Sequence, residues 1–183
     1  MTRKFKHNLV NFAFFQSAWL ACVLGAAHGV LSPAVLLTTV FIVWQLHPNN
    51  RANGDIQLVL VCCTIGFVLD TLWVQLGVIE YMTAVPFEGF APIWILFLWV
   101  SLALALNHSL AWLKNNLLWP VLFGAFGSPL SYYAGARLGA AFLPLDVMIT
   151  VSAFGISWAL VMLFLVVLSL RLTEPGREIN KAV

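Results

Sequence analysis

The chain has 183 residues, of which 62% are hydrophobic and 9% are charged, and its formal net charge is +2. A soluble domain carries about 25% charged residues, so this composition excludes a soluble enzyme and predicts an all-α, polytopic membrane protein surrounded by the lipid bilayer. The few basic residues fit the requirements of membrane topology, and no nucleic-acid partner is expected.

Six apolar segments, separated by polar or turn-rich stretches, predict six membrane-spanning helices. Their expected bounds within one integral membrane domain, 1–183, are about 9–27, 33–46, 56–80, 91–112, 117–136 and 147–170. The first segment follows a basic stretch, as in a signal peptide. Because Asn11 and Gln16 interrupt its apolar run and more spans follow at once, we favour an uncleaved first helix.

The basic residues divide unevenly between the two sides of a six-span topology. With the N-terminus inside, Arg137 is the only Lys or Arg on the outer side. The inner segments hold Arg3, Lys4, Lys6, Arg51, Lys114, Arg171, Arg177 and Lys181. Because cytoplasmic loops of membrane proteins are enriched in Lys and Arg, this division predicts that both termini are cytoplasmic.

One carboxylate, Asp70, interrupts the third apolar segment about 21 Å from the inner surface, at 1.5 Å per residue. A charge at the bilayer centre costs about 2.5–3.5 kcal/mol on insertion scales, so an intramembrane carboxylate is a functional-site hypothesis. Gly66, Asp70, Trp73 and Gly77 share one helical face. We predict that this face looks inward, and we place Trp73 among the candidate ligand-binding residues.

The fifth segment contains Gly127-Ser128-Pro129 at about the depth of Asp70. Because proline lacks an N–H and disrupts a helix interior, we expect a helix break at this point. Ser128, and Tyr132 one turn further out, are expected to donate to Asp70. We therefore assign Asp70, Ser128 and Tyr132 as candidate catalytic residues, although a purely structural role for Asp70 stays open.

Further along this segment, Gly135 and Gly139 have the GxxxG spacing, which predicts close packing against a neighbouring helix. Arg137 lies between them. It either snorkels to the outer surface or forms the wall of a pocket that has Asp70 at its floor. In the second case it would hold an anionic headgroup.

A second polar layer is expected nearer the inner surface. His108 lies about 25 Å from the outer surface and Gln16 about 11 Å from the inner one. Asn107 and Ser109 flank His108, and these side chains could share one cluster. We name Gln16, Asn107 and His108 as candidate ligand-binding residues, although an interfacial position for His108 stays open.

Metal and cofactor motifs are absent from the sequence. There is no HExxH, no GxSxG and no Walker loop. Adjacent Cys62 and Cys63 point to different sides of a helix, and together with Cys22 they are expected to be small apolar packing residues. Neither a metal nor a cofactor is expected.

Three segments resemble an uncharacterised family of small proteobacterial inner-membrane proteins, which is classed as a domain of unknown function. They are Ala91-Pro-Ile-Trp-Ile-Leu-Phe-Leu-Trp99, Leu106-Asn-His-Ser-Leu-Ala-Trp-Leu113 and Gly124-Ala-Phe-Gly-Ser-Pro-Leu-Ser-Tyr-Tyr-Ala-Gly-Ala-Arg-Leu-Gly139. The resemblance implies a multi-pass protein of the bacterial inner membrane and no particular activity. An association of such genes with lipid-modifying enzymes, such as cyclopropane-fatty-acid synthases, hints at lipid chemistry.

Two functions from different classes fit these residues. In the first, an intramembrane enzyme or accessory factor acts on lipid acyl chains or a lipid-soluble molecule, with Asp70 as acid or base and Ser128 and Tyr132 orienting the substrate. In the second, a small carrier or channel subunit uses Asp70 as a proton or cation site beside the broken fifth helix. Either function is compatible with an oligomer.

Overall fold

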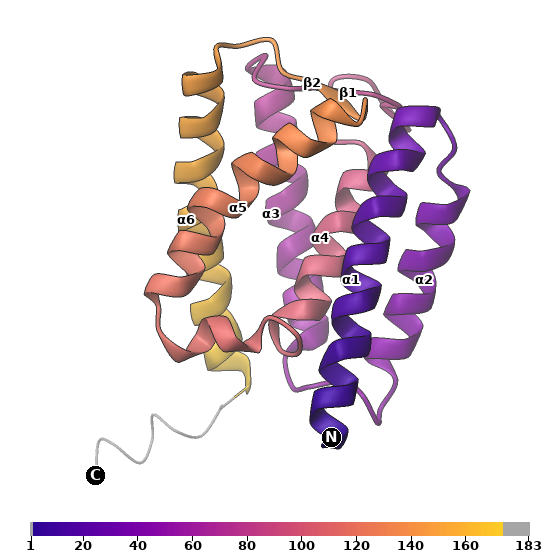
Figure 1. The fold of residues 1–183 in the computed structure, drawn as a ribbon, viewed down its shortest axis with the longest axis vertical. Coiled ribbons are helices and arrows are strands. Elements are labelled where there is room, and N and C mark those ends of the chain that lie inside the picture. The colour runs from indigo at the N-terminus through magenta and orange to yellow at the C-terminus, as the bar shows by residue number, and fades with distance from the viewer. Residues whose placement is uncertain (1, 174–183) are drawn as a thin grey trace.

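The computed structural model describes residues 2–173, and within this range it contains six α-helices (Figure 1). These are α1 (Arg3–His28), α2 (Ser32–Leu46), α3 (Asp55–Gln75), α4 (Ile93–Leu106), α5 (Leu118–Arg137) and α6 (Val147–Thr173). A 3₁₀ helix, η1 (Ala111–Asn115), precedes α5, and the strands β1 (Glu80–Tyr81) and β2 (Ala141–Phe142) form one short antiparallel pair. The prediction of an all-α fold is confirmed.

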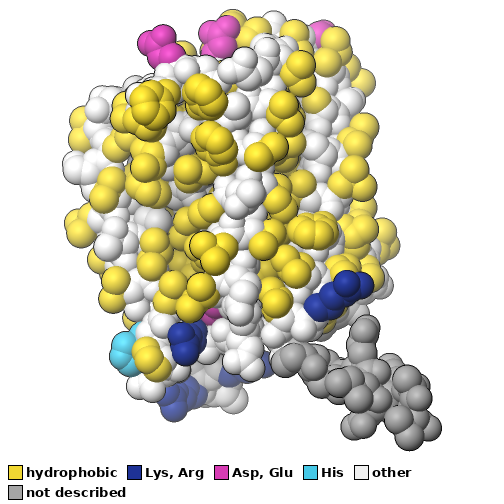
Figure 2. Space-filling view, turned by 180° about the vertical axis from the view of Figure 1, so that it is seen from behind, with side chains coloured by type: hydrophobic (Ala, Val, Ile, Leu, Met, Phe, Trp, Pro, Cys, Tyr) yellow, Lys and Arg dark blue, Asp and Glu magenta, His cyan; other side chains and the backbone are white. Residues whose placement is uncertain are grey.

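Successive helices run in alternate directions, so that α1 begins and α6 ends at the same end of the bundle (Figure 1). We call this the basic end, because it carries Arg3, Lys4, Lys6, Arg51, Lys114 and Arg171. The opposite, acidic end carries Glu80, Glu88 and Asp146, and Figure 2 shows the two kinds of charge at opposite ends of the molecule. The predicted inner positions of Arg177 and Lys181 lie outside the described residues.

Between these ends the surface is strongly apolar (Figure 2). Large side chains such as Leu36, Leu60 and Ile156 are each about two-thirds exposed on the outside of the helices. Three helices, α1, α3 and α6, are long and apolar enough to cross a membrane, and α2 and α4 are shorter apolar helices. Such a continuous apolar surface is too large for a monomeric soluble protein.

Helix α4 forms the centre of the bundle and packs against α1, α2 and α3. Its last turns, Ala103–Leu106, are fully buried, as expected of a helix that is apolar on every side. Helix α5 packs mainly along α6. Two glycines allow this approach: a Cβ atom on Gly124 would lie 2.3 Å from the Trp158 carbonyl oxygen, and one on Gly155 would lie 2.9 Å from the Ala125 carbonyl oxygen.

The predicted packing of Gly135 against a neighbouring helix is wrong, because a Cβ atom on Gly135 would meet no atom within 4 Å. Gly139 lies beyond the end of α5 with φ +87°, in the left-handed region that favours glycine. A Cβ atom there would lie 3.7 Å from the Ala27 Cβ atom of α1, which is an ordinary van der Waals contact. The close glycine contact of α5 with a neighbouring helix occurs about three turns before Gly135, at Gly124.

Two helices end earlier than predicted. Helix α3 ends at Gln75 rather than near 80, because Gly77 adopts φ +66° and the Val78 N–H bonds back to the Trp73 carbonyl. Helix α4 ends at Leu106 rather than near 112, in turns that lead to η1.

The predicted break in the fifth helix is also wrong, because α5 continues through Pro129. Proline removes only one backbone hydrogen bond, that to the Ala125 carbonyl. This carbonyl lies against Gly155 of α6, where no side chain intervenes. The close α5–α6 contact therefore supports the helix where its own hydrogen bonding is interrupted.

Candidate functional site

Asp70 is fully buried and accepts three hydrogen bonds from three other elements. The Tyr81 hydroxyl of β1 and the Tyr132 hydroxyl of α5 both donate to Oδ1, the latter at 2.9 Å. The Trp99 indole Nε1 of α4 donates to Oδ2 at 2.8 Å. No Lys, Arg or His among residues 2–173 pairs with this carboxylate. The prediction that Asp70 faces inward and meets Tyr132 is confirmed.

Tyr81 reaches Asp70 because the chain reverses after α3. The turn at Gly77 leads into β1, where Tyr81 pairs with Ala141 of β2. The Tyr81 ring also meets Trp94 edge-on, with the ring centroids 5.4 Å apart. Burial, and secondarily the nearby Asp70 carboxylate, raises the pKa of Tyr81 well above its usual value. The phenol therefore stays a neutral donor at physiological pH.

Trp99 reaches Asp70 because Gly66 leaves room for its ring. A Cβ atom at Gly66 would lie 2.4 Å from the Trp99 indole, far inside a van der Waals contact. The other face of the indole stacks on Trp158 of α6, with the ring centroids 4.5 Å apart. The face shared by Gly66 and Asp70 on α3 is thus shaped to receive this one side chain.

Tyr132 is held by two aromatic neighbours. Its ring stacks on Phe154 with the centroids 4.2 Å apart, and the Trp73 ring meets it edge-on at 5.5 Å. Trp73 itself is buried and packs behind Tyr132, where it fixes the orientation of the phenol. Trp73 does not line the cavity, so it supports Tyr132 rather than making the predicted ligand contact.

Ser128 and Arg137 do not contact Asp70. The Ser128 hydroxyl donates to the carbonyl oxygens of Gly124, at 2.8 Å, and of Phe154, at 3.2 Å. The expected hydrogen bond to Asp70 is therefore wrong, because the continuous helix gives Ser128 a carbonyl acceptor one turn back. The exposed Arg137 donates to the Tyr133 hydroxyl and covers its ring, with Cζ 5.1 Å from the centroid.

A cavity of about 420 Å³ lies between α1, α4 and α5, directly beside Asp70. Tyr81, Trp99 and Tyr132 form part of its wall and separate the cavity from the fully buried carboxylate. The other lining residues are mainly apolar, and they include Phe15, Val23, Leu98, Leu102, Phe123 and Trp158. Its size is within the range of about 300–1,000 Å³ that is usual for small-molecule sites.

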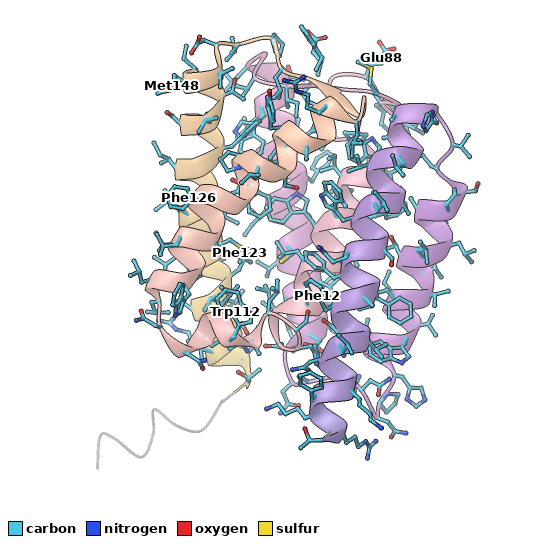
Figure 3. The ribbon with its side chains drawn as sticks, viewed as in Figure 1. Phe12, Glu88, Trp112, Phe123, Phe126 and Met148 are labelled. Atoms are coloured by element: carbon cyan, nitrogen blue, oxygen red, sulfur yellow. The ribbon has the colours of Figure 1, made fainter. Side chains whose placement is uncertain are left out.

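The cavity reaches the apolar surface between α1 and α5. Gln16 on α1 and Leu130 on α5 both line it and are both exposed. The Trp19 indole N–H of α1 donates to Ser131 Oγ of α5 at 2.9 Å, and this hydrogen bond joins the two helices beside the cavity. Phe126 of α5, in contrast to the cavity residue Phe123, is 67% exposed and lies on the side away from α1 (Figure 3).

The second polar layer lies at the basic end and is centred on Asp55, the first residue of α3. This buried carboxylate contacts His108 Nε2 at 2.9 Å and accepts from the Asn107 amide at 2.7 Å. It also accepts from the Ala52 N–H at 2.8 Å. Asn107 in turn accepts from Lys114 and Ser169. A carboxylate in the first turn of a helix is stabilised by the helix dipole.

The expected membership of this layer is corrected at one residue. Gln16 lines the cavity, and Asn11 belongs to the polar layer instead. The Asn11 side chain donates to Gln45 at 2.7 Å and accepts from the Ser109 hydroxyl at 2.5 Å. Gln45 also lies 3.0 Å from His108 Nε2. The proximity of His108, Asn107 and Ser109 within one cluster was predicted.

Sequence reasoning missed Tyr81, Trp99 and Asp55. Tyr81 lies just outside the predicted third span, 56–80, and therefore carries no signal of contact with Asp70. Trp99 carries a usable signal, since a buried indole N–H needs an acceptor and Asp70 is the carboxylate at that level. Asp55 lies just before the same span, and an acidic residue directly before an apolar run is a helix-start signal.

The fold and the site define a class: a helical protein with helices apolar enough to span a membrane, and a laterally placed apolar cavity backed by a buried carboxylate. The family model described as "Protein of unknown function (DUF2878)" matches residues 8–164, and the chain belongs to this family. No curated protein and no solved structure matches the chain.

Proposed function

We propose that this is an integral protein of the bacterial inner membrane that binds a lipid or lipid-soluble molecule in the cavity. We further propose that it acts as an enzyme or accessory factor in lipid or fatty-acid modification. One observation carries this proposal: an apolar cavity that reaches the outer surface of the helices has, in its wall, two phenols hydrogen-bonded to a carboxylate that has no counter-ion among residues 2–173. An intramembrane ionisable residue in such a position is typical of a functional site.

The proposed topology has six spans and cytoplasmic termini. It is supported by six helices that alternate in direction and by the gathering of Lys and Arg at one end. Helices α2 and α4 are short for a full span, and in this arrangement the polar turns at their ends complete the crossing. A reporter that is active only in the periplasm, fused after Val183, should be silent. Strong reporter activity would contradict the topology.

Asp70 would act on a bound molecule through Tyr132 rather than by contact. The carboxylate is fully buried, whereas Tyr132 lines the cavity and donates its proton to Asp70. If the phenol oxygen takes a proton from a bound group, its own proton passes to Asp70, and the charge moves to the substrate without a net change. Asp70 thus serves as the base, and Tyr132 is the residue that touches the substrate.

The other candidate residues differ in how directly they can contact a molecule in the cavity. Gln16 lines the cavity mouth and is a ligand contact. Ser128 also lines the cavity, but its proton is committed to backbone carbonyls. Arg137 lies outside the cavity, so its contact with an anionic headgroup, if any, is made at the surface. Asn107 and His108 belong to the distant polar layer and take no part in the cavity.

A proton- or cation-coupled carrier is the second candidate, and only the lack of a counter-ion at Asp70 favours it. The fully buried Leu58 and Cys62 separate Asp70 from Asp55 along the inward face of α3. Within residues 2–173 no hydrogen bond joins the two polar groups across this layer. The proposed lipid function requires no path across the protein, and a carrier requires one.

Occupation of the cavity can be tested directly by filling it. A Cβ atom at Gly135 meets no atom within 4 Å, and this residue lines the cavity. Gly135→Leu should therefore fill the space with little strain, and Ala13→Leu, on the exposed side of α1, is the matched control. Protein purified in mild detergent should carry a lipophilic molecule, detected by mass spectrometry, that Gly135→Leu removes and Ala13→Leu retains. Equal content in all three proteins would contradict the proposal.

A further inference from the structure

The wall of the cavity has an unusual balance of hydrogen-bonding groups. Tyr81 and Tyr132 both direct their protons to Asp70, and Ser128 directs its proton to two backbone carbonyls. These three residues line the cavity, so what they offer to a ligand is oxygen lone pairs. The indole N–H groups of Trp99 and Trp94 are committed as well, to Asp70 and to the Met82 carbonyl. The Nε1 of Trp158 has no hydrogen-bond partner among the described residues, but this atom is itself buried and is not exposed in the cavity.

The charges around the cavity also disfavour an anionic ligand. No Lys, Arg, His, Asp or Glu lines it within the described part of the chain. The carboxylate of Asp70 lies one hydrogen bond behind the wall, and no cation of the described residues pairs with it. In a medium of low dielectric constant such a charge repels an anion strongly. An ionised carboxylate or phosphate would therefore meet both lone pairs and a negative charge.

Two side chains of the wall can still donate a hydrogen bond to a ligand group that accepts as well as donates. Ser131 Oγ accepts from Trp19, which leaves the Ser131 proton to donate, and Gln16 at the mouth carries both a donor and an acceptor. A hydroxyl group fits this arrangement, because it donates to one oxygen of the wall and accepts from Ser131 or Gln16. An ester or an ether fits less well, because it only accepts.

From this geometry we infer that the cavity selects a lipid alcohol, a neutral apolar molecule whose polar end is a hydroxyl group, over the ionised fatty acid and the ester of the same chain. The inference rests on the proposed function, since it names the class of molecule that the same cavity takes. The hydroxyl donates to Tyr132, and the chain extends along Phe15, Leu102 and Phe123 toward the lipid-facing mouth. A free long-chain alcohol and a diacylglycerol share this chemistry.

Bromine quenching of tryptophan fluorescence tests the selection, because four tryptophans, Trp19, Trp94, Trp99 and Trp158, line the cavity. The detergent-solubilised full chain is titrated at a pH at which a fatty acid is ionised, with dibrominated octadecanol, dibrominated stearate and the methyl ester of the latter. We expect the alcohol to quench saturably and to bind about tenfold more tightly than the other two, which corresponds to about 1.4 kcal/mol. Dibrominated diacylglycerol in a further titration distinguishes a glycerolipid from a free alcohol.

Single-residue variants distinguish the preference for the alcohol from the binding of any lipid probe. Gly135→Leu, and independently Gly127→Leu at a second open position of the wall, should abolish saturable quenching by every probe. Asp70→Asn removes the charge and should raise the affinity for stearate toward that for the alcohol. Tyr132→Phe should lower the affinity for the alcohol to that for the ester. A purely structural role for either residue would change all probes alike.

The outcomes distinguish the two proposals. Equal affinities for alcohol, stearate and ester, all lost in Gly135→Leu, would overturn the selection and leave the lipid-binding function intact. Tighter binding of stearate than of the alcohol would also overturn it, and would favour an anionic headgroup held near Arg137. The absence of saturable quenching by any probe, or its persistence in both glycine variants, would contradict the proposed function itself.

Discussion

Helix α3 carries two buried carboxylates, Asp55 in its first turn and Asp70 near its far end, and their surroundings differ in kind. Asp55 has His108 as an ionisable partner, together with an amide, a backbone N–H and the helix dipole. Asp70 has three aromatic donors that line a cavity, and no cation among the described residues pairs with it. The first arrangement satisfies a charge completely, whereas the second keeps a charge one proton transfer away from an open space.

The comparison shows which of the two buried carboxylates lies beside a cavity that a ligand could occupy. Burial and hydrogen bonding are common to both, so neither property separates them. What separates them is their relation to the cavity: the three donors of Asp70 belong to residues that line it, whereas none of the donors of Asp55 does. The substitutions below are chosen to break each site and to compare the consequences.

The largest effect on stability is expected for Asp55→Leu. This change leaves His108, the Asn107 amide and the Ala52 N–H without their shared acceptor at the junction of several helices. Breaking one side of a buried ion pair costs about 3–5 kcal/mol. Thermal unfolding in detergent should show a large fall in the midpoint, and Arg51→Ala, an exposed neighbour, should show none. An unchanged midpoint for Asp55→Leu would mean that the layer is not structural.

A smaller effect is expected for Asp70→Leu. All three donors belong to residues that line the cavity, where water or a ligand can replace the carboxylate as their acceptor. A buried donor that stays without an acceptor costs about 1–3 kcal/mol, so the total loss is expected to stay near this range. Asp70→Asn keeps an acceptor for Trp99 and should melt close to wild type, yet lose the biological activity. If Asp70→Asn keeps full activity, the carboxylate has only a structural role.

Gly66→Ala should perturb the Asp70 site through Trp99. The added Cβ would overlap the Trp99 indole, and overpacking of this kind costs about 1–3 kcal/mol. The lower end is expected here, because the indole can shift toward the cavity. The shift should change the fluorescence spectrum of Trp99 and weaken its hydrogen bond to Asp70. A Gly66→Ala protein with unaltered emission and unaltered lipid binding would contradict the proposed fit between Gly66 and Trp99.

The smallest effect is expected for Arg137→Ala. Its guanidinium is exposed and contacts only Tyr133 among the described residues, and such surface changes usually stay within about 0.5 kcal/mol. The binding of a lipid alcohol should not change either, since Arg137 does not line the cavity. A marked loss of alcohol binding would show that the cavity communicates with this surface position, and Tyr133→Phe would then serve to locate the connection.

The sequence predicted those features that depend on composition, period and depth. The apolar segments predicted the helices, the shared face of Gly66 and Asp70 predicted an inward carboxylate, and residue counting brought Tyr132 to its level. The features that failed depend on close contacts. Whether Pro129 breaks α5 depends on what faces the Ala125 carbonyl, and this is decided by Gly155 on another helix.

The same limit applies to the site itself. Tyr81 lies only eleven residues after Asp70, yet the two meet because α3 ends before Gly77 and the chain turns back. An apolar run does not indicate such an end. Gln16 and Asn11 were both visible as polar interruptions of the first segment, but their separation into cavity and polar layer follows from helix positions that a single sequence does not provide.

The three donors of Asp70 come from chain positions 11, 29 and 62 residues after it, and this order has a consequence for biosynthesis. When α3 enters the bilayer, the ribosome delivers Tyr81 and Trp99 soon afterwards, so the first four helices can shelter the carboxylate by themselves. Tyr132 arrives only with the α5–α6 hairpin, which packs mostly on itself. If the helices assemble in chain order, the last hairpin closes one side of the cavity around a carboxylate that the earlier part of the chain has already stabilised, and its docking is the step that completes the proposed binding site.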